Sequence, residues 1–373
     1  MAFMLSTSWD VTKSRGQISL IDLNEWGWNQ DWEAKYRRAS QQGEPARIIA
    51  TYQGLFRVVT ESGEAWAEVA GRLRYALGSL WPVTGDFVVI RPGSRAIIVE
   101  VLDRASELVR KQPGDTTAHQ TVAANVDTTF LMQSLDRDFN VRRLERYLTM
   151  VWQGRSQPVV ILTKVDINAN TDAFIEQVVR IAPDTPVYGI SSTTGYGLEH
   201  LTPYLIPGHT VACVGSSGVG KSTLINRLCD GAGQRTQETR NGDQRGRHTT
   251  THRELFFTAE RALIIDTPGM RELQLSEGDL GLDLTFHDVV TWVSQCRYRN
   301  CQHQGEPGCM VQAAINSGDL DSDRWDAYRK LQRELEHQDR RSNPKAMAES
   351  REQWKKLSKA GRLNRRAKEG RFR

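Results

Sequence analysis

The stretch that decides the fold is TVACVGSSGVGKST, residues 210–223. Its apolar part predicts a buried strand, and the glycine-rich part predicts a loop that opens a helix. Glycines let backbone N–H groups approach phosphates, and the positive end of a helix favours an anion. Lys221 should reach the β- and γ-phosphates, and Ser222 should ligate Mg²⁺. We expect nucleotide phosphates to bind to Gly215, Ser216, Ser217, Gly218, Val219, Gly220, Lys221, Ser222 and Thr223.

A second motif, TKVD at residues 163–166, precedes the phosphate loop and concerns the base. The Asp166 carboxylate can accept two hydrogen bonds from the N1–H and 2-amino groups of guanine, and adenine offers no such pair. Lys164 can lie against the purine face and brace the phosphate loop. Thr163 stands where Asn is commoner, and its hydroxyl can still make one bracing hydrogen bond. The motif therefore predicts a guanine nucleotide.

The order of the remaining motifs is unusual. SSTTG at residues 191–195 also precedes the phosphate loop, and Ser191 and Ser192 would supply backbone donors near the guanine oxygen. The alternative for this segment is an ordinary Ser/Thr turn. DTPG follows last, where Asp266 should lie beside Mg²⁺ and the Gly269 N–H should contact the γ-phosphate. Because guanine-nucleotide proteins usually begin with the phosphate loop, the order predicts a circular permutation.

A polar segment, 230–247, separates the phosphate loop from Asp266 and ends in HTTT. It predicts a switch that brings a Thr hydroxyl to Mg²⁺, and we favour Thr250 over Thr251. Met270 occupies the position where many GTPases carry a water-orienting Gln, so intrinsic hydrolysis should be slow. His248 is the nearest polar candidate for that role, and a solvated loop histidine is the alternative. We therefore assign the expected catalytic roles to His248, Lys221 and Thr250.

Three of the five cysteines are clustered with a histidine. The spacing is Cys296-x4-Cys301-x-His303-x5-Cys309. Three thiolates and an imidazole are typical of a closed, structural zinc site. An odd, clustered set without an export signal argues against disulfides. A redox-sensitive thiol set is the weaker alternative.

Composition and patterning divide the 373 residues into five parts. We expect a leader at 1–45, loosely packed with one helix, and a β-barrel of the OB type at 46–115, because five short strands alternate with turns. Alternating strands and helices at 120–278 predict a parallel α/β domain, with two later strands adjoining in antiparallel fashion. A mainly helical zinc-binding domain follows at 279–340, and a basic tail at 341–373. No apolar run is long enough to cross a membrane, so we expect a cytoplasmic protein.

The basic charge is concentrated at the C-terminus. From Arg340 onward there are 13 Lys/Arg against 3 Asp/Glu, although the whole chain carries only +4. Such a tail predicts salt-dependent RNA binding, and a solvated helix fits its one-signed charge poorly. The barrel adds aromatic residues, some able to stack on bases and others expected in its core: Tyr52, Phe56, Trp66, Tyr75 and Trp81.

The combination resembles the RsgA (YjeQ/YloQ) family of small ribosomal subunit biogenesis GTPases. The motifs that carry the resemblance are AANVD at 123–127, the phosphate loop, GRHTTT at 246–251, DTPG and the cysteine cluster. It implies an OB-fold, a circularly permuted GTPase domain and a zinc domain that dock on the small (30S) subunit. It also implies that the subunit stimulates GTP hydrolysis, which drives release late in maturation. By this resemblance, the family's nucleotide-binding, catalytic and metal-binding roles belong to Lys221, Ser222, Asp166, Thr250, His248 and the four expected zinc ligands.

Two functions remain open at this point. The first is an enzyme: a slow GTPase that uses GTP, Mg²⁺ and one structural Zn²⁺ and is activated by the small subunit and its rRNA. The second is an RNA-binding assembly chaperone in which the nucleotide only sets the domain arrangement. We expect a monomer, and neither DNA nor a membrane as a partner.

Overall fold

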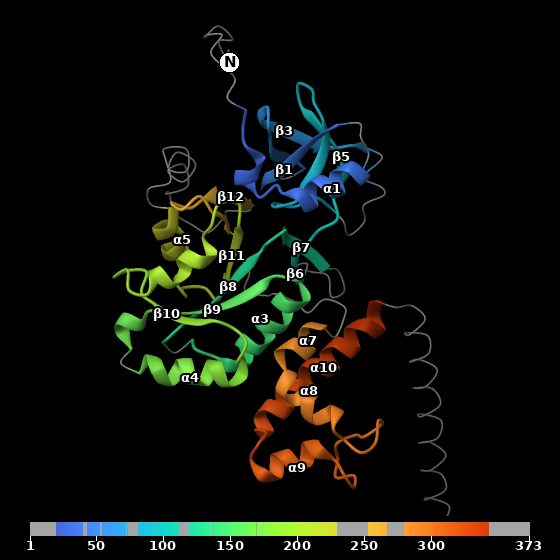
Figure 1. The fold of residues 1–373 in the computed structure, drawn as a ribbon, viewed down its shortest axis with the longest axis vertical. Helices are drawn as coiled ribbons and strands as arrows, with labels where there is room; N and C mark the ends of the chain where they lie inside the picture. Colours follow the sequence, from blue (N-terminus) through green and yellow to red (C-terminus); the bar gives the residue numbers. More distant parts are fainter. Residues whose placement is uncertain are drawn as a thin grey trace, which may run out of the picture.

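The structure is a computed structural model, and it describes residues 20–39, 43–52, 54–71, 73, 81–111, 119–136, 138–168, 170–229, 253–266 and 280–342. The molecule has three parts that follow one another along its long axis: a barrel, a central α/β domain and a bundle of C-terminal helices (Figure 1). In the described part of the chain, no helix is long and apolar enough to cross a bilayer.

The α/β domain is built on six strands in the order β10-β9-β8-β11-β13-β12. The first five are parallel, and β12 pairs antiparallel with β13, as the sequence predicts. Because β11 lies in the middle, the phosphate loop is central, and the base motifs follow strands on one side of it. The strands are β8 (Thr128–Ser134), β9 (Gln157–Thr163), β10 (Val187–Ile190), β11 (Thr210–Gly215), β12 (Arg253–Phe257) and β13 (Leu263–Asp266).

Helices cover both faces of this sheet, because alternate strand residues bury into two separate cores. Helix α3 begins where the Asn140 side chain accepts the Arg143 N–H, and Leu144, Tyr147, Leu148 and other apolar residues form its buried face. The helices are α3 (Val141–Gln153), α4 (Thr171–Ile181) and α5 (Lys221–Cys229), with 3₁₀ helices η3 (Val165–Ile167) and η4 (Leu198–Tyr204).

The barrel has the five strands expected from the sequence and closes through pairing of β1 with β4. Its interior is apolar, with Ile48, Phe56, Val88 and Ile98 fully buried. Phe56 thus belongs to the core, whereas Trp66 and Trp81 are partly exposed, and Tyr75 lies outside the described residues. The strands are β1 (Glu44–Thr51), β2 (Phe56–Thr60), β3 (Gly63–Val69), β4 (Phe87–Arg91) and β5 (Ala96–Val101).

The leader is packed rather than loose, so that part of the prediction was wrong for residues 20–39. Leu23, Trp26 and Trp32 are buried, and Trp28 and Trp32 make ring contacts with Phe87 of the barrel. These tryptophans stand among charged residues in the sequence, but they pack against Phe87 of the barrel and, through Trp26, against Phe257 of the α/β domain. The leader forms η1 (Leu23–Trp26) and α1 (Gln30–Arg38).

Two further features were not predicted. Strand β1 pairs antiparallel with β12, so the barrel and the α/β domain share one eleven-stranded sheet. A separate hairpin of β6 (Glu107–Lys111) and β7 (His119–Ala124) lies between the two bodies in Figure 1. The sheet therefore joins the two domains rigidly through their backbones.

The C-terminal helices pack on α3 (Figure 1). Buried Arg324 donates to the carboxylates of Glu145 and Asp288 and to the Thr285 carbonyl, while Arg146 binds both carboxylate oxygens of Glu334. These contacts tie the bundle to the α/β domain. The helices are α7 (Leu280–Thr285), α8 (His287–Ser294), α9 (Met310–Ser317) and α10 (Ser322–Ser342).

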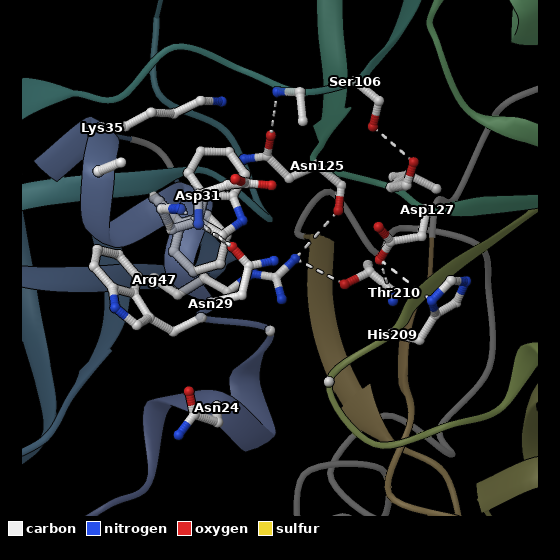
Figure 2. A pocket seen from close by; sticks show the side chains of 18 of the residues that line it. Asn24, Asn29, Asp31, Lys35, Arg47, Ser106, Asn125, Asp127, His209 and Thr210 are labelled. Carbon is white, nitrogen blue, oxygen red and sulfur yellow. Dashed lines mark hydrogen bonds and ion pairs between the residues drawn. The ribbon is translucent and has the colours of Figure 1, made fainter.

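Arg47 joins the leader, the barrel and the α/β domain. Its neighbours on β1, Ala46 and Ile48, fill the barrel, so period-two alternation turns Arg47 outward, toward the α/β domain. The side chain is 1% exposed. Its guanidinium donates to four neutral acceptors, two of them marked in Figure 2: the carbonyl oxygens of Trp26 (2.5 Å), Gly85 (3.3 Å) and Asn125 (3.3 Å) and the Thr210 hydroxyl (2.8 Å).

We expect Arg47→Met to destabilise the protein by about 2–4 kcal/mol, because it leaves several buried acceptors without a hydrogen-bond donor. Urea unfolding should show the loss. Arg37→Met is the control: the Arg37 side chain is 74% exposed, so its change should stay within about 0.5 kcal/mol. Equal effects of the two substitutions would contradict the role of Arg47.

Candidate active site and metal centre

The phosphate loop has the conformation that its sequence predicts. It lies between β11 and the start of α5, and Gly218 and Gly220 have φ values of 77° and 103°. A side chain at either position would be strained, so glycine is required there. The Lys221 ammonium donates to the carbonyl oxygens of Gly215 (2.7 Å) and Ser216 (2.6 Å), which folds it back over the loop. The lysine is thereby placed beside the backbone N–H groups that would surround a phosphate.

The base motif braces this loop. Thr163 is 2% exposed, and its hydroxyl lies 2.7 Å from the Val219 carbonyl and 3.3 Å from the Gln133 carbonyl. The first contact crosses from the end of β9 to the phosphate loop. The expected bracing hydrogen bond is therefore present, although Thr replaces Asn.

Two carboxylates that sequence analysis missed follow strand β8. Asp136 accepts a hydrogen bond from the Lys164 ammonium at 2.9 Å, and this contact holds the pKa of Asp136 down to about 2. Asp138 accepts the Ser216 hydroxyl and is also paired with Arg143 at the start of α3. Their position at the carboxyl end of a parallel strand was the signal that could have identified them.

The two base-reading segments meet at one edge of the sheet. Strands β9 and β10 are parallel neighbours, so the loops that follow them lie side by side. Asp166 and Thr194 line one cavity of about 470 Å³ together with Tyr188, Tyr196 and His200. Ser191 is buried, and its hydroxyl accepts the Thr194 N–H at 3.2 Å. This contact is that of a Ser/Thr turn, the alternative considered for this segment. The turn leaves the predicted contact of Ser191 and Ser192 with guanine as a prediction.

Some predicted residues lie outside the described part of the chain: His248, Thr250, Thr251 and Gly269. Asp266 is the last residue of β13, and its backbone is in register with Glu254 of β12. This places it at the same sheet edge as the phosphate loop, because β11 and β13 are parallel neighbours.

The cysteine cluster converges on one point. One ligand atom from each of Cys296, Cys301, His303 and Cys309 lies within 4.8 Å of the others. The His303 Nδ1 atom is 3.5 Å from the Cys296 sulfur and 3.6 Å from the Cys309 sulfur. Burial, with the neighbouring thiols, raises the pKa of Cys301 to about 11. Three thiolates this close require a cation, so the donor set fits a metal ion.

Relatives of known family match almost the whole chain. The small ribosomal subunit biogenesis GTPase RsgA of Opitutus terrae is 41% identical and covers 94% of this chain and all of the relative. RsgA 1 of Oceanobacillus iheyensis is 40% identical over 92% of this chain and all of its own length. A family model described as RsgA GTPase matches residues 101–276. The chain belongs to the RsgA GTPase family. The resemblance found in the motifs is thereby confirmed, and this family implies a guanine nucleotide and Mg²⁺.

Two solved structures agree with the fold of this family member. YloQ, described as a circularly permuted GTPase, is 26% identical with a TM-score of 0.57, covering 80% of this chain and 96% of its own. YjeQ from Thermotoga maritima is 24% identical with a TM-score of 0.59, covering 78% and 98%. The likeness to YjeQ concerns the fold alone. The likeness to YloQ, together with the strand order, confirms the circular permutation.

We expect Thr163→Val to weaken GDP binding about five- to tenfold, because valine keeps the volume but leaves the Val219 carbonyl without its donor. Titration of a fluorescent GDP analogue measures the effect. Thr163→Ser is the matched control, since it keeps the hydroxyl, and it should bind almost as tightly as the wild type. Equal affinities for the valine and serine variants would contradict the bracing role.

Proposed function

We propose that the chain hydrolyses GTP during late maturation of the small ribosomal subunit. The subunit stimulates hydrolysis, and hydrolysis releases the protein from the subunit. The convergence of base and phosphate motifs at one edge of the permuted sheet carries the proposal, since it supports the binding of one guanine nucleotide by both motifs. The printed names of the relatives supply the ribosomal context.

Within this site, Lys221 would neutralise charge on the β- and γ-phosphates, while Asp166 would select guanine. Ser222 would bind Mg²⁺ together with Thr250, and Asp266 would stand beside the ion. The ion would offset the negative charge that develops on the phosphate oxygens. His248 would orient the attacking water, because Met270 cannot do so. With no Gln at that position, unstimulated turnover is slow.

We assign the cysteine cluster to one structural Zn²⁺ held by Cys296, Cys301, His303 and Cys309. Three sulfurs and one nitrogen match the donors that closed zinc sites use. Cys309 also begins helix α9, where its sulfur accepts the Gln312 N–H. A metal at this point would therefore order the helix and the turn before it.

For partners, we propose rRNA contacts through the barrel, the zinc-binding helices and the basic tail, with the protein acting as a cytoplasmic monomer. The exposed tryptophans of the barrel support base stacking. The one-signed charge after Arg340 supports binding to phosphates, although residues 343–373 lie outside the described part of the chain.

We expect small subunits to raise GTP turnover by roughly tens-fold or more, and Lys221→Ala to lower the stimulated rate by about 100-fold or more. Phosphate release with and without purified subunits measures both effects. Lys330→Ala on α10, compared by turnover without subunits, is the control for loss of an exposed lysine. Equal turnover with and without subunits would contradict activation, and full rescue of maturation by Lys221→Ala would favour the chaperone instead.

We expect Cys309→Ala to abolish binding of the single zinc ion and to lower helix content, because the ligands are brought together by the metal. Metal analysis and circular dichroism measure these changes. Cys229→Ala removes a buried thiol outside the cluster and should retain one zinc ion per chain. Full zinc content in the Cys309 variant would overturn the assignment.

A further inference from the structure

One short loop contacts both of the motifs expected to bind the nucleotide. It lies between Ser134, the last residue of β8, and the start of α3, and it carries two carboxylates. Asp136 accepts a hydrogen bond from the Lys164 ammonium of the base motif at 2.9 Å. Asp138 accepts one from the Ser216 hydroxyl of the phosphate loop. The loop therefore reaches the part of the site expected at the purine and the part expected at the phosphates.

The two carboxylates are fixed by the backbone around them. One oxygen of Asp136 accepts the Asp138 N–H at 2.9 Å, and its other oxygen accepts the Lys164 ammonium. The Leu135 N–H donates to the Thr163 carbonyl at 3.0 Å, which ties the loop to the end of β9. Both side chains thus start from a rigid edge of the sheet, as a positioning role requires.

Lys164 has a backbone conformation that must be held in place. Its φ and ψ angles are 62° and 37°, in the left-handed region that a residue with a Cβ atom rarely adopts. Such a conformation persists only where surrounding contacts maintain it. Here the Thr163 hydroxyl donates to the Val219 carbonyl at 2.7 Å, and Asp136 holds the ammonium. With its ammonium anchored, Lys164 can lay its methylene stem against a purine in one fixed direction.

Each carboxylate is neutralised by a neighbouring cation. The Arg143 guanidinium donates to one oxygen of Asp138 at 3.0 Å and lies 2.9 Å from the other, and Lys164 neutralises Asp136. Without these cations, two negative charges beside the phosphate loop would repel a nucleotide. The four side chains are 28–38% exposed, so the pairs add little to stability. Their effect is to set the direction of the groups that they hold.

We propose that Asp136 and Asp138 are positioning residues for the two halves of the bound nucleotide. Asp136 holds Lys164 for contact with the purine, and Asp138 holds Ser216 so that the phosphate loop keeps its shape when phosphates bind. The inference rests on the proposed function, in which the base motif and the phosphate loop bind one guanine nucleotide. Neither carboxylate contacts the nucleotide itself, because each acts through the residue that it holds.

The first test is titration of a fluorescent GDP analogue with the full-length Asp136→Ala and Asp138→Ala variants. We expect each variant to bind about five- to tenfold more weakly. Charge alone predicts the opposite sign, because the loss of a carboxylate favours an anionic ligand. Asp184→Ala removes an exposed carboxylate from the turn after α4 and should bind as the wild type does. Unchanged or tighter binding by either loop variant would overturn the role of that residue.

Double variants test whether each carboxylate acts through its partner. Lys164→Met keeps the methylene stem without the ammonium, and Ser216→Ala removes only the hydroxyl. Asp136→Ala should change GDP affinity less than about twofold in the Lys164→Met background and should keep its full effect in the Ser216→Ala background. Asp138→Ala should show the reverse. A full effect in the partner's background would contradict positioning through that partner.

Stability separates positioning from a purely structural role. Without nucleotide, both alanine variants should melt within about 3 °C of the wild type, because partly exposed ion pairs contribute little. A clear fall in melting temperature with unchanged GDP affinity would assign the carboxylates to folding and overturn the inference. A wild type that binds no guanine nucleotide would contradict the proposed function itself. Equal GDP affinity in the wild type and both variants would contradict only the positioning roles.

Discussion

The buried guanidinium of Arg47 is the interaction on which the arrangement of the domains depends. Burial lowers its pKa to about 10 against the opposing charges of Asp127 and Asp86, and four neutral acceptors take its hydrogen bonds. A full charge among dipoles is stable only if every acceptor stays in place. The glycine at position 27, where φ is 82°, follows from this, because a Cβ there would lie 2.7 Å from the Arg47 Nη1 atom and from the Gly208 carbonyl oxygen.

The sheet shows which elements the circularly permuted chain places beside the nucleotide site. In the described part of the chain, β12 is bordered by the barrel on one side and by the strand ending in Asp266 on the other. On the opposite side of the phosphate loop, Asp138 connects Ser216 to the start of α3, and α3 carries the salt bridges to the C-terminal helices. Both flanking bodies are thus linked to the nucleotide site through described contacts, in addition to the chain connection after Gly269.

Much of this organisation could be read from local sequence. Helix α3 is an example, because Asn140 caps its start and apolar residues recur along it with the helical period. The Cys₃His set and the phosphate loop were equally clear, since each consists of residues close together in sequence. Asp136 and Asp138 were missed, because a carboxylate after a strand acquires a role only when the neighbouring strand is known. The buried leader was missed for the same reason.

By itself, the sequence determined the guanine-nucleotide chemistry, the permuted order and the ligand set of the metal centre, because these depend on residue type and short spacing. Tertiary structure decided that β1 pairs with β12 and that Arg47 is shared by three parts of the chain. Strand pairing, and side-chain hydrogen bonds between residues as far apart as 47 and 210, depend on the register of whole elements, which no local pattern records.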